Sequence, residues 1–259
     1  MLLLLPPSEG KTAPSAGEPL NLRGLSEASL TRHRRTVLTA LVRASRSTEA
    51  LSLLKVGPSL VDDVRRNRLL KTAPTAPANE VYTGVLYEAA GLGTLPAGGA
   101  QRADRWIRTV SALWGLVTPT DRIPAYRLSM GAALPDVGPL ARSWRAPLAA
   151  VLDPIARERL VVDCRSAPYA AAWPGCGRGP GHVSVSVLRE LDGRRTVVSH
   201  FAKHTRGVLT RHLVLREEPE PGTPRDLLEA AGELVGGALR DATLREVGPG
   251  RHVLELVVG

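Results

Sequence analysis

Short apolar segments that lie far apart along the chain constrain the fold more than any other feature of the sequence. Residues 2–5, the start of the segment 105–131 and residues 159–164 have the apolar composition of buried strands. Residues 182–191 and 195–201 instead alternate and flank the turn dipeptide Asp192-Gly193, and residues 243–258 show a second hairpin pattern. Separated strands together with local β-hairpins predict an α+β fold with a mixed β-sheet.

Helical patterns occupy much of the chain between these strands. We expect helices over 26–46, 80–91, 140–152 and 223–239, and a further helix that follows the first hairpin within 199–214. Ser26 is the expected N-cap of the first of them. At 100° per residue, one exposed basic stripe of that helix is formed by Arg32, Arg35, Arg43 and Arg46. This stripe is either an ordinary solvated face or a binding face.

The size and composition of the chain predict one compact domain over residues 1–259. With 259 residues, 43% of them hydrophobic, the chain can bury one large core. Its apolar run after Met1 is far too short for a signal peptide or a membrane span, so we expect a cytoplasmic protein with no membrane partner. Cys164 and Cys176 lack C-x-x-C spacing and are expected to be reduced packing residues.

The segment "LLLLPPSEGKT", residues 2–12, ends like a nucleotide-binding P-loop but lacks its other half. The motif needs a glycine at the position of Leu5, and Pro6 and Pro7 remove two of the backbone N–H donors that would bind phosphate. The pattern therefore indicates a strand that ends in a tight polar turn. Lys11 remains a candidate for phosphate contact.

Positive charge is concentrated in one part of the chain. The formal net charge is +9, and residues 31–71 contribute +7 of it through eight Arg and two Lys against three acidic residues. Because the chain has 30 Arg and only 4 Lys, each lysine is more informative than an individual arginine. A local basic face of this kind is what a polyanionic partner would meet.

Residues 50–71, "ALSLLKVGPSLVDDVRRNRLLK", have the pattern of a helical hairpin. Apolar residues 51–54 lead to Val56-Gly57-Pro58, where Pro58 suits the first turn of a second helix. The hydrophobic-Gly turn resembles the helix-hairpin-helix DNA-binding element, whose backbone N–H groups contact phosphate. The residues of this segment that we predict to contact DNA are Lys55, Gly57, Arg65, Arg66 and Arg68.

A second basic pattern lies in "SHFAKHTRGVLTRHLV", residues 199–214. Lys203, Gly207 and Arg211 share one helix side, with Arg206 beside them, and we interpret Gly207 as leaving a gap for a phosphate or base. The alternative is a basic surface helix. His200 and His204 lack the glutamate of a helical zinc site, so the sequence predicts no metal and no cofactor.

Five sequence blocks together resemble one known family. They are "LLPPSEGKT" (4–12), "VYTG" (81–84), "LWGLVTPTDRIPAYRLSMG" (113–131), "VVDCRSAPY" (161–169) and "FAKHTRGVLTRHLV" (201–214). Their order and spacing are similar to those of the YaaA peroxide stress protein family. The resemblance implies a cytosolic bacterial protein linked to peroxide resistance and low free iron. It also implies a single-domain family fold with a positively charged cleft and a DNA-binding helix-hairpin-helix element.

The resemblance assigns site residues only where the blocks match. The matching positions are Lys11, Tyr82, Tyr126, Arg127, Ser166, Tyr169, Lys203, Arg206, Gly207 and Arg211. The chain departs from the family pattern at several neighbours: Pro-Ser-Glu-Gly-Lys replaces Ser-Pro-Ala-Lys, and Asp163, Phe201 and His204 replace Asn, Tyr and Lys. These departures indicate a divergent branch.

Two functions are consistent with these patterns. In the first, the hairpin and a basic cleft bind DNA through phosphate contacts with little sequence specificity, and so protect it during oxidative stress. In the second, the chain is an enzyme that acts on a nucleotide or nucleobase ligand. Its candidate catalytic residues are then Tyr126, Ser166, Tyr169 and Lys203. The patterns identify neither the natural ligand nor the oligomeric state.

Overall fold

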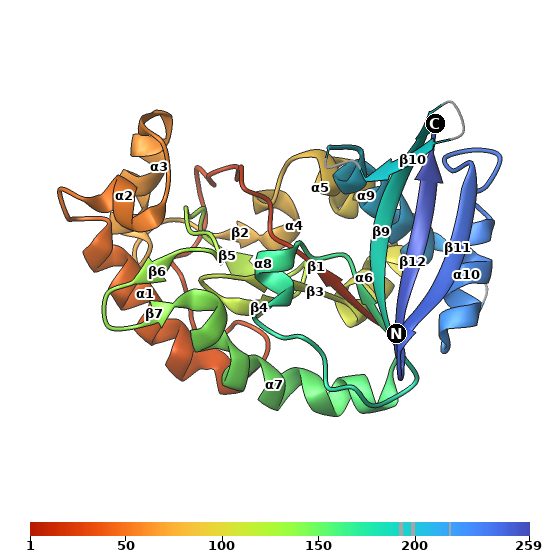
Figure 1. Cartoon of the computed structure of the whole chain (residues 1–259). Helices are drawn as coiled ribbons and strands as arrows, with labels where there is room; N and C mark the ends of the chain where they lie inside the picture. Colours follow the sequence, from red (N-terminus) through yellow and green to blue (C-terminus); the bar gives the residue numbers. More distant parts are fainter. Residues whose placement is uncertain (192–193, 198–199, 218) are drawn as a thin grey trace.

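A computed structural model describes residues 1–191, 194–197, 200–217 and 219–259 (Figure 1). Its main sheet has the strand order β11-β12-β9-β8-β1-β3-β4, with β10 beside β9. The strands are β1 (Leu2–Leu5), β3 (Ile107–Ser111), β4 (Gly115–Val117), β8 (Val161–Asp163), β9 (His182–Leu191), β10 (Arg194–Val197), β11 (Asp241–Gly248) and β12 (Arg251–Val258). Parallel pairing joins β3, β1, β8, β9 and β12, and the remaining pairs are antiparallel. The predicted α+β fold with a mixed sheet is confirmed.

The helices and two small sheets surround this sheet (Figure 1). The helices are α1 (Thr31–Ala44), α2 (Ala50–Leu54), α3 (Val61–Arg66), α4 (Ala78–Val81), α5 (Val85–Ala90), α6 (Ala97–Trp106), α7 (Leu140–Glu158), α8 (Ala167–Ala170), α9 (His200–Leu215) and α10 (Pro224–Gly232). The small sheets pair β2 (Ala76–Pro77) with β5 (Arg122–Ile123) and β6 (Ala133–Leu134) with β7 (Gly138–Pro139). No helix in the described part of the chain is long and apolar enough to span a membrane.

Strand β1 lies at the centre of the fold. All four of its residues are at most 3% exposed, and it pairs in parallel with β3 on one side and β8 on the other. The carboxyl ends of β1, β3 and β8 therefore meet at the same edge of the sheet. Ligand sites in α/β sheets form at such an edge, where the chain leaves one strand toward neighbours on both sides.

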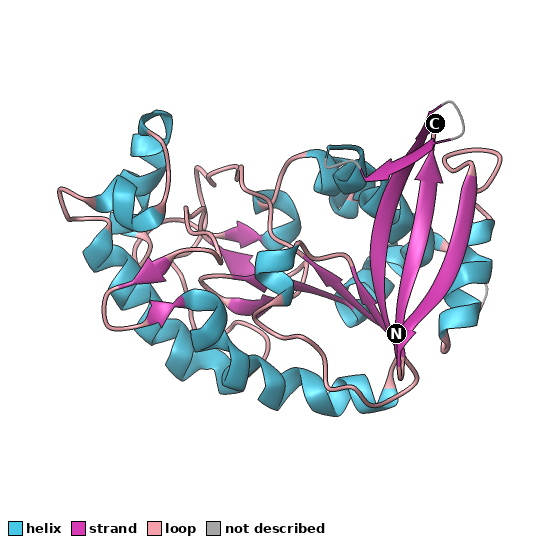
Figure 2. Ribbon diagram, viewed as in Figure 1, coloured by secondary structure: helices cyan, strands magenta, loops and turns pink. Residues whose placement is uncertain are grey.

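Helices cover only one face of the carboxyl-terminal strands (Figure 2). In β9, Val183, Val185 and Val187 point into the core, where α9 packs, while His182 and Ser184 on the opposite face remain more exposed. This alternation is the reason the segment could be predicted as a strand. The outer face of β9 and β12 is therefore accessible beside α8.

Several predicted element boundaries were wrong. Ser26 does not cap a helix, because its N–H and hydroxyl groups donate to Asp121 at 2.7 and 2.5 Å and α1 begins only at Thr31. The strand expected from residue 105 begins at Ile107, after α6. The helix expected over 140–152 continues to Glu158.

The carboxyl-terminal elements show the same kind of difference. The helix expected over 223–239 starts in a capping box at Thr223 but ends at Gly232. The strand expected over 195–201 ends at Val197, and α9 begins at His200. The hairpin partners β9 and β10 pair as predicted, whereas the turn dipeptide 192–193 lies outside the described residues.

Gly207 allows α9 to pack closely against α5. A Cβ at this position would overlap the carbonyl oxygen of Leu86 and lie 2.7 Å from the Cβ of Ala89. The interpretation that Gly207 leaves a gap for a phosphate is therefore wrong, since α5 fills the space. The close contact between α9 and α5 therefore requires a glycine at this position in the middle of the helix.

Gly207→Ala is expected to destabilise the protein by about 1–3 kcal/mol, because the added methyl group must displace the α5 backbone. The measurement is the free energy of unfolding in urea. Gly232→Ala is the matched control, since nothing lies within 4 Å of a Cβ at that helical glycine. The control should be neutral or stabilising by up to about 1 kcal/mol. Equal effects of the two changes would contradict the packing argument.

Candidate functional site

The loop that follows β1, residues 6–11, separates two recesses at the carboxyl edge of the sheet. One, here the Lys11 recess, is lined by Ser8, Glu9, Lys11, Arg127, Leu128, Ser129 and Tyr169. The other, here the Lys203 recess, has a volume of about 230 Å³ and is lined by residues 6–10 and 83–87 and by Lys203. Ser8 and Glu9 line both recesses. The structure thus brings Lys11, Arg127, Tyr169 and Lys203 to two sides of one loop.

Lys11 is a half-buried amine held in a defined position. Its Nζ donates to the carbonyl oxygen of Ser8 at 2.6 Å and lies 4.3 Å from the ring centroid of Tyr126. Its backbone forms an isolated antiparallel bridge with Tyr82. Burial, together with the charge of Arg127, lowers the pKa of Lys11 from 10.5 to about 7. Lys11 can therefore exchange a proton near neutral pH.

A buried chain of hydroxyl groups supports Lys11 from below. The Tyr126 hydroxyl lies 2.7 Å from Ser111 Oγ and 3.0 Å from the Tyr82 hydroxyl. Burial raises the pKa of both tyrosines far above the ordinary value, so both stay neutral. Neither lines a recess. Tyr126 and Tyr82 therefore position and shield the Lys11 amine through their rings.

Glu9 forms an ion pair with the guanidinium group of Arg127. Arg127 donates to the Glu9 carboxylate at 2.8 Å and to its carbonyl oxygen at 3.1 Å. The Arg127 side chain is 14% exposed, while that of Glu9 is 66% exposed. Tyr169 lines the same recess, and burial raises its pKa to about 12. An anionic ligand of Arg127 must therefore displace the solvent-exposed carboxylate of Glu9.

Asn67 connects this recess to the helical hairpin and was missed by sequence reasoning. Its side chain accepts from the Arg127 N–H at 2.9 Å and donates to the Arg127 carbonyl at 2.9 Å. Lys55 adds a second link, because its Nζ donates to the Gly131 carbonyl at 3.1 Å. In the sequence, Asn67 stands between two arginines and looks like a surface residue. No local pattern shows that its side chain binds the backbone of a distant residue.

Within the predicted helical hairpin, residues 50–71, two short helices are joined by a turn over residues 50–66. Helix α2 ends at Leu54 and is capped by Lys55, which has φ 54°. Gly57 precedes the 3₁₀ turn Pro58–Leu60 and α3. Gly57 is extended and has open space around it. The arginines of the hairpin already have partners within the protein. Arg65 pairs with Asp62 and Arg66 with Asp63, while Arg68 donates to the Ser45 carbonyl.

Two other predicted binding arginines hold the backbone. Arg206 donates to the Val185 carbonyl at 2.7 and 3.2 Å, and Arg211 donates to the Ala90 and Gly91 carbonyls at the end of α5. Both side chains are thereby directed away from the two recesses, which neither of them lines. The continuous basic face predicted along α9 is therefore absent from the described residues.

Ser166 also lies apart from the recesses. It precedes α8 and is exposed, and its carbonyl oxygen accepts from the Tyr169 N–H at 2.9 Å. Lys203 is exposed on α9 and belongs to the Lys203 recess. Of the candidate catalytic residues, only Tyr169 and Lys203 line a recess.

Comparison with known proteins identifies the family of this chain. The sequence model described as "Peroxide stress protein YaaA" matches residues 1–230. A UPF0246 protein of Streptomyces coelicolor is 45% identical over 237 residues, 90% of each chain. A UPF0246 protein of Corynebacterium glutamicum is 39% identical over 243 residues, 91% of this chain and 94% of its own. The chain belongs to the YaaA peroxide stress protein family, as its sequence blocks predicted.

Lys11 is expected to react with acylating reagents at pH 8 ahead of the exposed lysines, because most of its amine is uncharged there. Peptide mass spectrometry of competitive labelling across pH 6–10 measures this. Arg127→Gln removes a repelling charge and should move the Lys11 labelling midpoint to higher pH. Glu9→Gln removes an attracting charge and should move it lower. Shifts of the same sign in both variants would contradict the assignment.

Proposed function

We propose that this peroxide stress protein binds DNA along one surface that includes the hairpin 50–71 and the Lys11 recess. The observation that carries the proposal is the Asn67 clamp on the Arg127 backbone, which fixes the hairpin against the recess. A strand that contacts the hairpin turn can thereby reach Arg127 once the Glu9 side chain has moved aside, with no change in the position of the hairpin. Covering DNA or aiding its repair would limit oxidative damage, which fits a member of a peroxide stress protein family.

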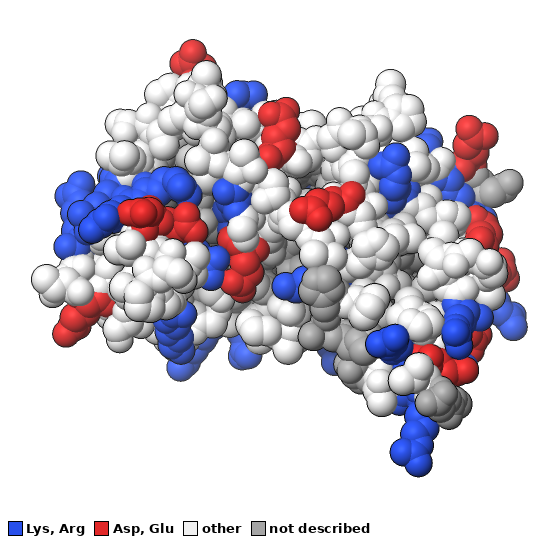
Figure 3. Space-filling model, turned by 90° about the horizontal axis from the view of Figure 1, so that it is seen from above, with Lys and Arg blue, Asp and Glu red and all other residues white. Residues whose placement is uncertain are grey.

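The distribution of charge supports this surface. Figure 3 shows Lys and Arg side chains gathered at the end of the molecule formed by α1–α3, with acidic side chains beside them. The ion pairs of Arg65 and Arg66 are exposed or half-exposed, and pairs of this kind contribute little stability. Phosphate groups can therefore replace Asp62 and Asp63 as their partners at little cost. Binding of this type depends on the release of counterions and weakens with salt.

The Lys11 recess supplies a second, more selective contact within this proposal. Glu9 lies on Arg127 where a phosphate oxygen would bind, and its exposed side chain can swing aside. A phosphate would then face Arg127 and, below about pH 7, a charged Lys11. With Glu9 in place the recess has a volume of only about 10 Å³, so we infer that a phosphate group of a distorted or single-stranded segment contacts Arg127 only after the Glu9 side chain moves aside.

Lys55→Glu with Arg65→Glu is expected to lower DNA affinity on the order of tenfold or more and to reduce the salt slope of log K by roughly 2, since two phosphate contacts are lost. Fluorescence anisotropy with a labelled duplex between 50 and 200 mM salt measures both. Both side chains are exposed, so the unfolding midpoint should hold.

Arg225→Glu with Arg240→Glu is the matched control for charge. Arg225 is exposed on α10 and Arg240 is exposed just before β11, both at the opposite end of the molecule (Figure 1). This variant has the same net charge as the hairpin variant and should bind DNA almost as well as the unmodified chain. Equal losses in the two variants would show that only net charge matters and would refute the proposed surface.

A nucleotide-directed or nucleobase-directed enzyme is the second candidate. It is favoured by the Lys203 recess, whose place at the carboxyl edge of parallel strands is typical of small-molecule sites, and by the proton-exchanging Lys11 beside it. In this version Lys203 binds phosphate and Tyr169 contacts the base across Glu9.

Lys203→Ala should weaken binding of a mononucleotide while leaving duplex affinity within about twofold of the unmodified chain, because Lys203 belongs neither to the hairpin nor to the Lys11 recess. Equilibrium dialysis with a set of nucleoside monophosphates measures the first effect and anisotropy the second. If mononucleotides bind neither protein, or bind both equally, the enzyme candidate is rejected.

A further inference from the structure

The outer side of α1 carries a line of positive charge that belongs neither to the hairpin nor to the two recesses. Its members are the basic stripe expected from the sequence, Arg32, Arg35, Arg43 and Arg46, and all four are exposed. The apolar residues of the opposite side of α1 are buried in the core. At 100° per residue, the three arginines inside the helix fall within about 80° of its circumference. The stripe is therefore a real and narrow surface feature.

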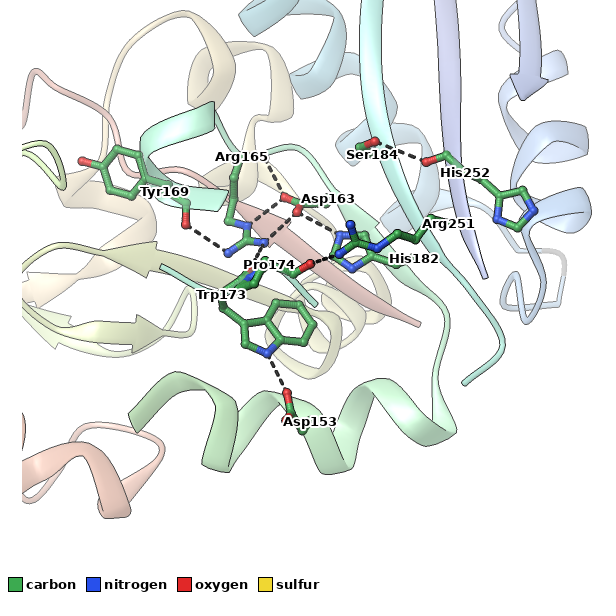
Figure 4. A network of polar contacts seen from close by, with 10 residues as sticks. All are labelled: Asp153, Asp163, Arg165, Tyr169, Trp173, Pro174, His182, Ser184, Arg251 and His252. Carbon is green, nitrogen blue, oxygen red and sulfur yellow. Dashed lines mark hydrogen bonds and ion pairs between the residues drawn. The ribbon is translucent and has the colours of Figure 1, made fainter. Parts of the chain in front are cut away.

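Arginines that hold the fold and arginines that are free for a ligand differ in their partners. Arg165, in the chain between β8 and α8, shows the first kind (Figure 4). It is fully buried and donates to the two carboxylate oxygens of Asp163 at 2.8 and 2.6 Å and to two backbone carbonyls. The side chains of Arg32, Arg35 and Arg46 have no hydrogen bond or ion pair with any residue that the structure describes. Three of the four charges of the stripe are thus available to a partner.

A groove runs beside the stripe, between α1 and the turn that joins β6 to β7. It has a volume of about 300 Å³. It is lined by Arg35, Thr36, Thr39, Ala40, Arg43, Asp136 and Val137. Thr39 is exposed between the two arginines, and among the described residues its hydroxyl group has no partner. The groove therefore offers two guanidinium groups and a free hydroxyl group, which are all donors that phosphate oxygens accept.

Asp136 is the carboxylate that borders this groove. It forms an ion pair with Arg43, and the side chains of Arg43 and Asp136 are 59% and 72% exposed. An ion pair this exposed contributes little stability, because water screens it. A phosphate oxygen can therefore take the place of the Asp136 carboxylate on Arg43, in the same way as for the ion-paired arginines of the hairpin.

The stripe is continuous with the hairpin. Arg68 of the hairpin donates to the Ser45 carbonyl at 2.7 Å, and the Asn67 amide donates to the Ser45 hydroxyl at 3.2 Å. Arg46 follows Ser45 directly in the chain. Figure 1 shows α1 extending from this junction away from α2 and α3. A polyanion bound to the hairpin can therefore continue along α1 without a break in the positive surface.

The stripe suits the backbone of a nucleic acid duplex better than an anionic membrane. A helix that binds a membrane surface buries an apolar face, whereas no large apolar side chain is exposed on α1. Arg32 and Arg43 are separated by about 16 Å along the helix axis, since each residue rises 1.5 Å. That length corresponds to roughly five base pairs at 3.4 Å each. An extended row of cations and hydroxyl groups matches an extended row of phosphates.

We propose that the basic stripe and its groove are a second DNA contact surface, which binds the phosphate backbone of a duplex that continues from the hairpin along α1. This inference rests on the proposed DNA binding by the hairpin and adds the form and length of the DNA. The hairpin and the Lys11 recess hold a distorted or single-stranded segment, and α1 holds the regular duplex beside it. Because the stripe contacts phosphates alone, it adds affinity without sequence preference.

Arg32→Glu with Arg35→Glu tests the part of the stripe that lies far from the hairpin. With a labelled duplex of about 20 base pairs, fluorescence anisotropy should show an affinity lowered on the order of tenfold and a salt slope of log K lowered by roughly 2. With a duplex of about 8 base pairs, which the hairpin can hold alone, the affinity should stay within about twofold. Both side chains are exposed and unpaired, so the unfolding midpoint should hold. Arg225→Glu with Arg240→Glu has the same net charge and should bind both duplexes like the unmodified chain.

Asp136→Asn tests the groove with a change of opposite sign. The substitution removes the carboxylate that competes for Arg43, so it should strengthen binding of the long duplex by about twofold to fivefold. Asparagine suits the backbone here, because Asp136 has φ 64°. Glu229→Gln is the matched control, since it removes one exposed carboxylate from α10. Equal effects of the two changes, or weaker binding by Asp136→Asn, would contradict a phosphate in the groove.

The two pairs of variants separate this proposal from DNA binding by the hairpin. If Lys55→Glu with Arg65→Glu weakens binding of the long duplex but Arg32→Glu with Arg35→Glu does not, the stripe is refuted and the hairpin surface stands. The reverse result supports the stripe and refutes the hairpin surface. If the stripe variant loses binding to vesicles of anionic phospholipid but keeps its duplex affinity, the stripe is a membrane contact and the proposal is overturned.

Discussion

Burial of β1 between two parallel neighbours is the constraint on which the remaining structure depends. Its four leucines are removed from water on both faces, and full burial of such a side chain contributes about 1.5–3 kcal/mol. Parallel pairing with β3 and β8 then directs the chain out of the sheet at one edge. The polar loop 6–11 and the chain after β8 have to meet there. Both recesses at that edge follow from this topology.

Several arginines in this protein donate hydrogen bonds to backbone carbonyls. Arg34 is fully buried and binds the carbonyls of Trp114 and Leu116, and Arg206 and Arg211 bind those of Val185 and of the end of α5. A planar guanidinium suits this role because it offers several donors in a fixed geometry. The formal charge of +9 therefore overstates the positive surface available to a ligand.

Two polar clusters lie on either side of α8. In the Lys11 recess the cationic groups are partly occupied by Glu9, and access requires a side chain to move. Beside His182 the carboxylate of Asp163 is neutralised by the fully buried side chain of Arg165. Tyr169 touches both through different atoms.

The sequence by itself determined the fold class, the family and the approximate place of the core. These properties can be predicted from local patterns, namely the alternation in β9, the apolar run of β1 and the five family blocks. It also placed Lys11 and the hairpin among the candidates. Helix ends were less predictable, as with Ser26, because a side chain that can cap a helix can equally bind a distant Asp121.

Only the tertiary structure decided which polar residues meet. Gly207 reads as an open gap in the sequence but is filled by α5, and the basic side chains of Arg206 and Arg211 turn to carbonyls far away along the chain. The pairing of Asp163 with His182, 19 residues later, depends on two strands lying side by side. Periodicity reports which side of an element is buried, whereas contacts between elements depend on packing that no local pattern encodes.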